Sequence, residues 1–299
     1  MSAAPQDATR ARETFNRLLG ELRPKLHRYC ARMTGSVIDG EDVVQEALVK
    51  AVEAFEQTEA IPNLQGWLFR IAHNTALDVL RRRARQTAIS ADEDLDMIFD
   101  PVIVTEDRQT ASASLRTLMR LPVAQRSSVI LMDVLGYSLD EISLIIETSV
   151  PAVKAALHRG RARPRELAQE PEDRPLPILR EPERSRLAAY VDRFNARDFD
   201  TIRDLLAEDV QLDLVNRTRM NGRTEVGTYL GNYSRVHDWR LVAGFVDGRP
   251  AILVHDPAGS TMTPTYFVLL GWSAGRISRI RDFRHARYAI EGAELIIAH

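Results

Sequence analysis

The sequence predicts a multidomain chain in which two all-α helical modules precede one α+β domain with a cone-shaped sheet. Three observations support this fold class. Apolar residues recur with the period of a helix in residues 10–85 and again in residues 112–168. Short apolar runs separated by glycine-containing turns replace that period from residue 184 onward. The stretches between these parts, 86–111 and 169–183, are acidic and proline-rich respectively and are predicted to be linkers.

Length and composition are those of an ordinary globular protein. The 299 residues exceed one typical domain, and 44% hydrophobic with 27% charged residues can form buried cores. The net charge of -2 argues against a uniformly basic nucleic-acid coat protein, so contact with DNA has to come from local basic patches. Cys30 is the only cysteine, which excludes an intramolecular disulfide and a cysteine zinc cluster. No apolar run approaches the ~20 residues that span a bilayer, so we expect a cytoplasmic protein without membrane contact.

The first module is predicted to begin with two helices. The first covers residues 11–33 and is interrupted at Pro24. The second runs from Asp39, which can cap it, to Phe55. The face opposite its apolar stripe carries acidic and amide side chains, namely Asp42, Gln45, Glu46 and Glu53. Taken alone, such a strip is explained by a solvated helix surface.

Residues 66–83 are predicted to form a third helix with two distinct stripes. Apolar or small residues at helical spacing form a buried stripe, made of Leu68, Ile71, Ala72, Thr75 and Val79. A second stripe combines aromatic, amide and charged side chains, namely Trp67, Arg70, Asn74, Asp78 and Arg81, and continues into Arg82, Arg83 and Arg85. An aromatic ring can stack on an unpaired base while cations hold the adjacent phosphates, so this stripe suits single-stranded or opening DNA. A surface helix with a buried tryptophan and arginines that offset the helix dipole is the alternative.

Residues 112–168 are predicted to contain a helix-turn-helix. Ser138 and Glu141 have the spacing of a capping box, and Pro151 falls in the first turn of the following helix. The outer face of that second helix is almost wholly cationic, with Lys154, His158, Arg161 and Arg165 flanked by Arg159 and Arg163. Such a face repels itself unless an anion lies against it, and a phosphate backbone beside a major groove fits.

Together, these blocks closely resemble region 2 and region 4 of bacterial sigma factors of the extracytoplasmic function (ECF) type. The region 2 residues are Asp39-x-Glu41-Asp42-x-x-Gln45-Glu46 and Gly66-Trp67-Leu68-Phe69-Arg70-Ile71-Ala72-x-Asn74-x-x-Leu77-Asp78-x-x-Arg81-Arg82-Arg83. The region 4 residues include Leu121-Pro122, Arg126, Gly136-Tyr137-Ser138, Glu141-Ile142, Ser149-Val150, Val153-Lys154 and Leu157-x-Arg159-x-Arg161. Glu147 departs from the pattern, because the family usually has a turn glycine there, and this puts the turn geometry in doubt.

The resemblance implies partners and site residues. It implies that the acidic strip contacts the RNA polymerase core through Asp39, Asp42, Gln45 and Glu46. It implies that region 2 opens and holds the minus-ten promoter element with Trp67, Arg70, Asn74, Arg81, Arg82 and Arg83, the loop 57–65 holding a flipped base. It implies that region 4 reads the minus-thirty-five element with Ser149, Lys154, His158, Arg159, Arg161 and Arg165. The acidic linker is similar to the family's connection through the RNA exit channel, and a plain solvated tether explains its composition equally well.

The last part of the chain, residues 184–299, is predicted to form helices followed by a curved sheet. Helices are expected at 183–196 and around Phe199 to Leu206, a strand at 210–215, a short helix after Gly222, and further strands at 239–246, 250–255, 265–272 and 276–283. Turns are expected at Gly248, Pro257 to Gly259 and Gly275. This order resembles a SnoaL-like (nuclear transport factor-like) cone of four to six strands, and its pieces are Phe194-Asn195-Ala-Arg-Asp198, Leu206-Ala-Glu-Asp209-Val210 and Gly222-Arg223.

Such cones have an open mouth that binds small apolar ligands, and some members are isomerases, cyclases or hydrolases that use an Asp/His pair. The titratable candidates are Asp213, His237, Asp238, His255, Asp282 and His285. The candidate ligand pocket consists of Tyr190, Phe194, Asp213, Trp239, His255 and Phe267. The alternative is that the polar residues lie at strand edges and the aromatic residues form ordinary core.

The sequence therefore predicts an ECF-type sigma factor that directs RNA polymerase core to promoters and is modulated in cis by its C-terminal domain. No cofactor, metal or catalytic residue is expected, while a small ligand or an anti-sigma partner is a candidate further partner. An enzyme that acts on a small metabolite in the cone, with a DNA-binding first half, is the main alternative. A simple helix-turn-helix repressor is a third interpretation, but it leaves residues 39–83 unexplained.

Overall fold

The computed structural model of the protein separates into two compact units with separate hydrophobic cores. The structure describes residues 4–58, 61–90, 115, 118–167, 177–237, 239–257 and 263–298. Unit 1 contains the described residues up to 167, and unit 2 contains those from 177 onward. Most of the two predicted linkers, at 86–111 and 169–183, lies outside the described residues. No helix in the described part of the chain has the length and apolar character needed to cross a membrane.

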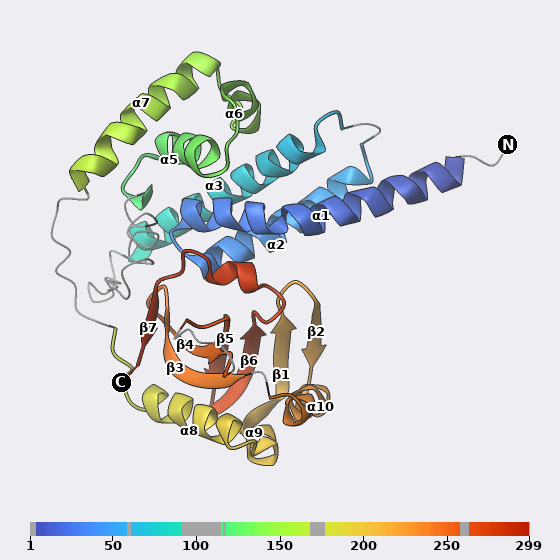
Figure 1. Cartoon of the computed structure of the whole chain (residues 1–299), viewed down its shortest axis with the longest axis vertical. Helices are drawn as coiled ribbons and strands as arrows, with labels where there is room; N and C mark the ends of the chain where they lie inside the picture. The colour runs from blue at the N-terminus through green and yellow to red at the C-terminus, as the bar shows by residue number, and fades with distance from the viewer. Residues whose placement is uncertain are drawn as a thin grey trace. The chain divides into compact units, whose positions relative to one another are not determined.

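The first module of unit 1 consists of three long helices (Figure 1). They are α1 (Ala4–Thr34), α2 (Val37–Phe55) and α3 (Leu64–Ser90). The predicted interruption at Pro24 is wrong, because α1 continues through it. Leu22 and Leu26 on either side are buried in the core, and this packing offsets the backbone hydrogen bond that a proline removes.

The start of α2 and the end of α3 also differ from the prediction. Ser36, rather than Asp39, caps α2, and its hydroxyl accepts a hydrogen bond from the backbone N–H of Asp39 at 3.4 Å. Asp39 lies in the first turn, where the helix dipole favours a carboxylate. Because α3 runs to Ser90, it extends past residue 85, where the first module was predicted to end.

The second module of unit 1 is the predicted helix-turn-helix preceded by further helical turns. Its elements are α5 (Val123–Val129), the π-helical η1 (Ile130–Val134), α6 (Leu139–Ile145) and α7 (Val150–Leu167). The capping box of Ser138 and Glu141 is confirmed, as is Pro151 in the first turn of α7. Glu147, between α6 and α7, has a φ of 52°, so the turn keeps the left-handed conformation that usually calls for glycine.

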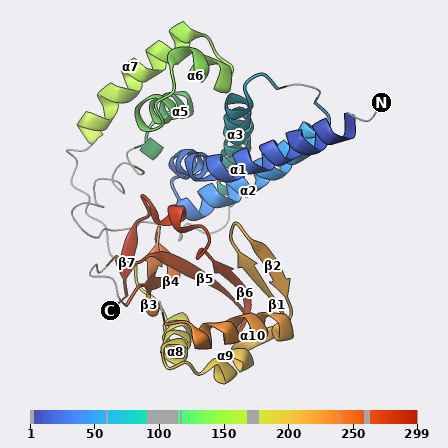
Figure 2. The same ribbon diagram turned by 45° about the vertical axis from the view of Figure 1, so that its right-hand side comes forward.

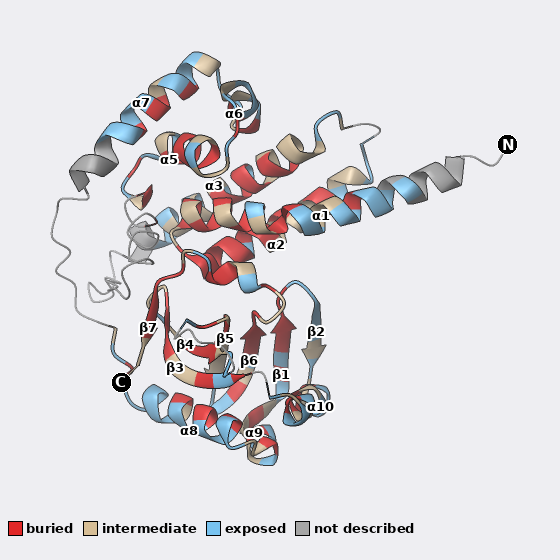
Figure 3. Ribbon diagram, in the orientation of Figure 1, coloured by how far each residue is buried: buried red, intermediate tan, exposed pale blue. Residues whose placement is uncertain are grey.

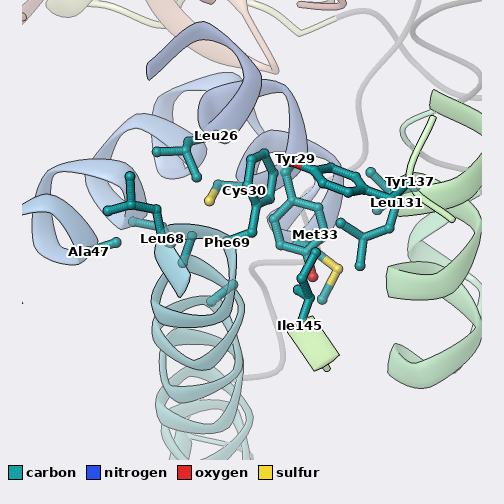
Figure 4. Packing of buried hydrophobic residues seen from close by; sticks show 14 of the residues in the cluster. Leu26, Tyr29, Cys30, Met33, Ala47, Leu68, Phe69, Leu131, Tyr137 and Ile145 are labelled. Carbon is teal, nitrogen blue, oxygen red and sulfur yellow. The ribbon is translucent and has the colours of Figure 1, made fainter. Parts of the chain in front are cut away.

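Buried residues lie on the helices of both modules of unit 1 (Figure 3), and they form a single hydrophobic core. Tyr29 and Phe69 from the first module lie in one cluster with Tyr137, Leu131 and Ile145 from the second (Figure 4). The rings of Phe69 and Tyr137 meet edge to face, with centroids 5.1 Å apart. The two helical modules are therefore packed against each other in this conformation.

Unit 2 is an α+β domain with one curved sheet, as predicted (Figure 2). Its helices are α8 (Glu183–Asn195), α9 (Phe199–Leu205) and α10 (Arg223–Asn232). The strands are β1 (Leu206–Leu214), β2 (Thr218–Asn221), β3 (Arg240–Val246), β4 (Arg249–His255), β5 (Tyr266–Ser273), β6 (Arg276–Asp282) and β7 (Leu295–Ile297). The sheet has seven strands in the order β2-β1-β6-β5-β4-β3-β7, one more than the four to six expected.

The strand pleat divides the residues of the sheet between two faces. Leu212 and Leu214 of β1 and Ile280 of β6 join the core that α8 and α9 also enter through Tyr190, Phe194 and Ile202. The intervening residues Asp213 and Arg281 point to the opposite face of the sheet, because successive side chains of a strand alternate. The core face of the sheet is therefore the helix-covered face.

Candidate nucleic-acid interface

The mixed stripe on α3 is not uniformly exposed. Trp67 is half-buried and its ring is tilted against Phe15, with centroids 6.5 Å apart. Asn74 is exposed. Arg70 forms an ion pair with Glu147 of the helix-turn-helix turn at 3.5 Å. Within this stripe, the amide of Asn74 thus faces solvent, while the guanidinium of Arg70 contacts the second module.

The basic run at the end of the stripe pairs with the acidic strip on α2. Arg82 Nη2 lies 3.0 Å from Glu46 Oε2, and Arg83 Nη2 lies 2.9 Å from Asp39 Oδ2. Arg81 instead pairs with Asp78 on its own helix at 3.2 Å. The residues predicted to contact polymerase and those predicted to contact DNA therefore neutralise each other across α2 and α3.

The remaining residues of the acidic strip differ in exposure. Asp42 is exposed, whereas Gln45 and Glu46 are half-buried. The pKa of Glu46 is lowered, first by its hydrogen bond with Lys50 and also by Arg82. Glu46 is thus held as a carboxylate that is paired with two cations, Lys50 and Arg82.

On α7, the predicted DNA-facing side chains fall into two groups. Lys154, His158 and Arg159 are exposed. Arg161 is engaged by Asp133 of η1 through two hydrogen bonds, one of them Nε to Oδ2 at 2.9 Å. Ser149 lies at the start of α7, where its hydroxyl accepts a hydrogen bond from the N–H of Ala152 at 3.4 Å. The side chain of Arg165 lies outside the described residues.

Two polar contacts between the modules were not foreseen from the sequence. Arg126, which is 5% exposed, donates from Nη1 to the carbonyl of Met33 at 2.6 Å and from Nη2 to the carbonyl of Leu121 at 3.0 Å. Gln65 Nε2 donates to the phenol of Tyr137 at 2.7 Å. Arg126 is the single charged residue between Pro122 and Met132, and this is the sequence signal that could have indicated the first contact.

In unit 2 the six residues of the candidate ligand pocket do not come together. Tyr190, Phe194 and Trp239 pack in the core under the helices, with the rings of Phe194 and Trp239 4.9 Å apart. Asp213 lies on the opposite sheet face within 3.5 Å of Arg219. Phe267 stacks on Phe283, with ring centroids 4.1 Å apart, and Phe267 precedes Val268, which belongs to the core face.

His255 also lies apart from the aromatic core. It follows the core residue Val254 on β4, so the pleat points it to the other face of the sheet. Its pKa is lowered, first by burial and then by Arg240. Asp213 and His255 therefore both lie on the sheet face away from the aromatic core, on strands β1 and β4, which are separated in the sheet by β6 and β5.

A cavity of about 480 Å³ lies instead beside α10 and the turn between β1 and β2. Its wall includes Tyr229, Tyr233 and His285. Behind it, Tyr233 donates a hydrogen bond to the buried carboxyl of Asp282 at 2.8 Å. Of the titratable candidates from the sequence, Asp282 and His285 are thus the ones associated with this cavity.

Comparison with known proteins assigns both helical modules. The model of Sigma-70 region 2 matches residues 18–86, and that of Sigma-70, region 4 matches residues 114–163. The ECF RNA polymerase sigma factor SigG of Mycobacterium tuberculosis is 29% identical over 308 residues, covering 93% of this chain and 83% of SigG. SigM of the same species, also an ECF RNA polymerase sigma factor, is 32% identical over 153 residues, covering 51% of this chain and 76% of SigM. The solved structure of M. tuberculosis SigJ, an ECF sigma factor, covers 88% of this chain and 93% of SigJ at 19% identity, with a TM-score of 0.36.

Region 2 followed by region 4 defines a sigma factor, the class of protein that directs RNA polymerase to promoters for transcription. The chain belongs to the ECF sigma factors, the family to which SigG and SigM belong. The predicted family is confirmed. Because the match to SigG covers 93% of the chain, it extends beyond region 4 into unit 2.

Proposed function

We propose that this sigma factor rests in a closed state, in which region 2 and region 4 are packed together, and initiates transcription only after they separate. The observation that carries the proposal is the shared core of the two modules, where Tyr137 packs on Phe69. In the proposed order of events, the interface between region 2 and region 4 opens first. The two regions then bind separate sites on the polymerase, and each binds its own promoter element.

The geometry of DNA explains why the modules have to separate. Promoter elements centred near minus ten and minus thirty-five lie about 25 base pairs apart, which is about 85 Å of B-form duplex. A compact unit of roughly 150 residues has a radius of gyration of about 15 Å and a diameter of about 40 Å. A closed unit is therefore too small for its two modules to read both elements at once.

The placement of the predicted site residues supports the following assignment of residues to each partner. We assign Asp42, Gln45 and Glu46 on α2 to the polymerase core, with Asp39 released from Arg83 to join them. We assign Trp67, Arg70, Asn74, Arg81, Arg82 and Arg83 to the opened minus-ten strand, and Ser149, Lys154, His158, Arg159, Arg161 and Arg165 to the minus-thirty-five duplex. Arg70 is paired with Glu147 and Arg82 with Glu46 in the closed unit, so DNA and polymerase would compete with these ion pairs.

Unit 2 acts in cis as a modulator in this proposal. It has its own core, and it is joined covalently to the sigma modules. A tethered domain acts at high effective concentration, so even a weak contact with a sigma module would suppress initiation without a separate anti-sigma protein.

Run-off transcription with core polymerase tests both parts of the proposal. A chain that ends at Leu167 should give more transcript than the full chain, and equal promoter opening by the two would remove the inhibitory role of unit 2. Tyr137→Phe removes the hydrogen bond from Gln65 but keeps the ring, so it should shift the closed equilibrium about fivefold toward opening, since one such bond contributes about 1 kcal/mol. Unchanged initiation by this variant would contradict the closed state.

Tyr29→Phe is the matched control. The Tyr29 hydroxyl bonds to His73 Nδ1 at 2.6 Å within the first module alone, so its loss should cost stability without favouring separation. If both variants raise transcription equally, the effect is general destabilisation and the role assigned to the module interface fails.

The prediction that the chain has no enzymatic activity stays a prediction. The alternative enzyme would depend on Asp213 or His255, and a turnover that disappears with Asp213→Asn or His255→Gln would establish it. The separation of these two residues from the aromatic core favours the sigma factor without a catalytic step.

A further inference from the structure

One aromatic side chain of α1 contacts both ends of the connection between α2 and α3. Because α2 ends at Phe55 and α3 begins at Leu64, residues 56–63 form this connection. The ring of Phe15 is stacked on that of Phe55, with centroids 4.0 Å apart and an interplanar angle of 1°. The same ring lies against Trp67 in the first turn of α3, with centroids 6.5 Å apart and an interplanar angle of 57°. Phe15 therefore links the last residue of α2 to the first turn of α3.

The three rings differ in burial. Phe15 is 2% exposed, whereas Phe55 and Trp67 are half-buried. A ring that is enclosed in a close-packed core keeps one position, because its neighbours leave no room for other rotamers. Phe15 is therefore the fixed support against which the two partly exposed rings are held.

Polar contacts anchor the chain at the same two ends. At the end of α2, Arg12 Nη2 lies 3.2 Å from Glu56 Oε1, and Arg12 precedes Phe15 by about one turn of α1. At the start of α3, the side-chain oxygen of Asn63 accepts a hydrogen bond from the backbone N–H of Gly66 at 2.9 Å. A Cβ atom built at Gly66 would lie 2.9 Å from Nδ2 of Asn63, so a larger residue would displace this cap. Both ends of the connection thus have defined positions relative to α1.

We propose that Phe15 is a positioning residue for strand opening, because it holds the ring of Trp67 at the surface where an unpaired base would stack on it. The inference rests on the assignment of Trp67 to the opened minus-ten strand under the proposed function. Removing the Phe15 ring would leave a cavity beside the half-buried indole, and filling that cavity would bury apolar surface. Trp67 would then withdraw from the surface, and the unpaired base would lose its stacking partner.

Two promoter templates test this role with the full-length holoenzyme. One is a duplex promoter that the wild-type holoenzyme opens, and the other has non-complementary bases across the minus-ten element, so that its strands are already apart. Permanganate reactivity of unpaired thymines measures opening of the duplex, and run-off transcript measures initiation on both templates. Phe15→Leu keeps an apolar side chain but removes the ring, so duplex opening should fall about fivefold, the scale of one aromatic contact. Initiation from the open template should stay within about twofold of wild type, because base pairing no longer competes with stacking on Trp67.

Leu26→Val is the matched control. Leu26 is 1% exposed and lies about three turns beyond Phe15 on the same helix. This substitution also removes buried volume from the first module, so any effect on initiation should be equal on the two templates. A loss with Phe15→Leu that is equal on both templates, or an unchanged opening of the duplex, would overturn the positioning role.

Two further variants separate this inference from the assignment on which it rests. Phe55→Leu replaces a half-buried ring of the same stack, and we expect it to show the same difference between templates if Phe15→Leu does not fold. Trp67→Ala should reduce duplex opening at least as much as Phe15→Leu does. No loss with Trp67→Ala would remove the assignment of Trp67, and the inference with it. A loss with Trp67→Ala but none with Phe15→Leu would remove only the role of Phe15.

Discussion

Replacing Gly40 by alanine should separate α1 from α2, although alanine is the better helix former. A Cβ atom built at Gly40 lies 2.5 Å from the backbone N of Ala31 and 2.6 Å from its Cα. Both atoms belong to the backbone of α1, so no side-chain rotation relieves the clash. Overpacking of this kind costs about 1–3 kcal/mol, and the helix propensity of alanine returns about 1 kcal/mol. We expect a net loss of up to about 2 kcal/mol in the free energy of unfolding of unit 1.

Gly20→Ala provides the matched control, because Gly20 is exposed in α1 and no atom lies within 4 Å of the Cβ that would be added. That variant should gain about 0.5–1 kcal/mol from helix propensity alone. Urea unfolding followed by circular dichroism measures both variants, and hydrogen exchange of peptides from α1 and α2 locates the change. The reasoning is refuted if Gly40→Ala is as stable as Gly20→Ala, or if its exchange rises outside the α1–α2 contact.

Three further predictions concern buried and charged groups of unit 1. Burial lowers the pKa of His73 to about 4. The unfolded chain therefore binds a proton on this side chain below about pH 6.5, whereas the native state binds it only near pH 4. The free energy of unfolding should therefore fall by about 3 kcal/mol between pH 7 and pH 4, and urea titrations of His73→Gln should lose this slope. Glu147→Gly should stabilise the turn by about 1 kcal/mol, because it relieves the left-handed backbone, whereas Glu147→Val should destabilise it in thermal unfolding. Lys154→Gln combined with Arg159→Gln should reduce the salt dependence of promoter binding by the holoenzyme by a slope of about 2, and an unchanged slope would exclude both side chains from phosphate contact.

Local signals in the sequence predicted the helix-turn-helix well, because the physics there is local. The capping box of Ser138 and Glu141 satisfies its own backbone donors, and Pro151 has no amide to lose in a first turn. Pro24 shows the limit of such reasoning. The hydrogen bond that Pro24 removes from the helix depends only on the local backbone. The compensating burial of Leu22 and Leu26 depends instead on helices that are distant in the sequence. Tertiary packing therefore overrode a valid local preference.

The pocket of unit 2 was beyond prediction for a different reason. Alternation along β1 and β6 indicates that Asp213 and Asp282 each have apolar neighbours, but it does not say which face the helices cover. The parallel register of β1 with β6, which pairs Leu214 with Asp282, places Asp282 on the covered face and Asp213 on the other. The register between two strands depends on both of them, so it could not be predicted from the sequence of either strand alone.

The closed unit is held by contacts of unequal strength, and this determines what can open it. The ion pair of Arg70 with Glu147 between the two modules is exposed to water, so it contributes at most about 1 kcal/mol and is screened by salt. The Phe69–Tyr137 contact and the hydrogen bond from Arg126 to Met33 are buried and respond little to ionic strength. Salt should thus weaken DNA binding while leaving the closed state in place. In the proposed closed state, opening requires a partner that replaces these buried contacts, and we expect the polymerase surface rather than promoter DNA alone to do so.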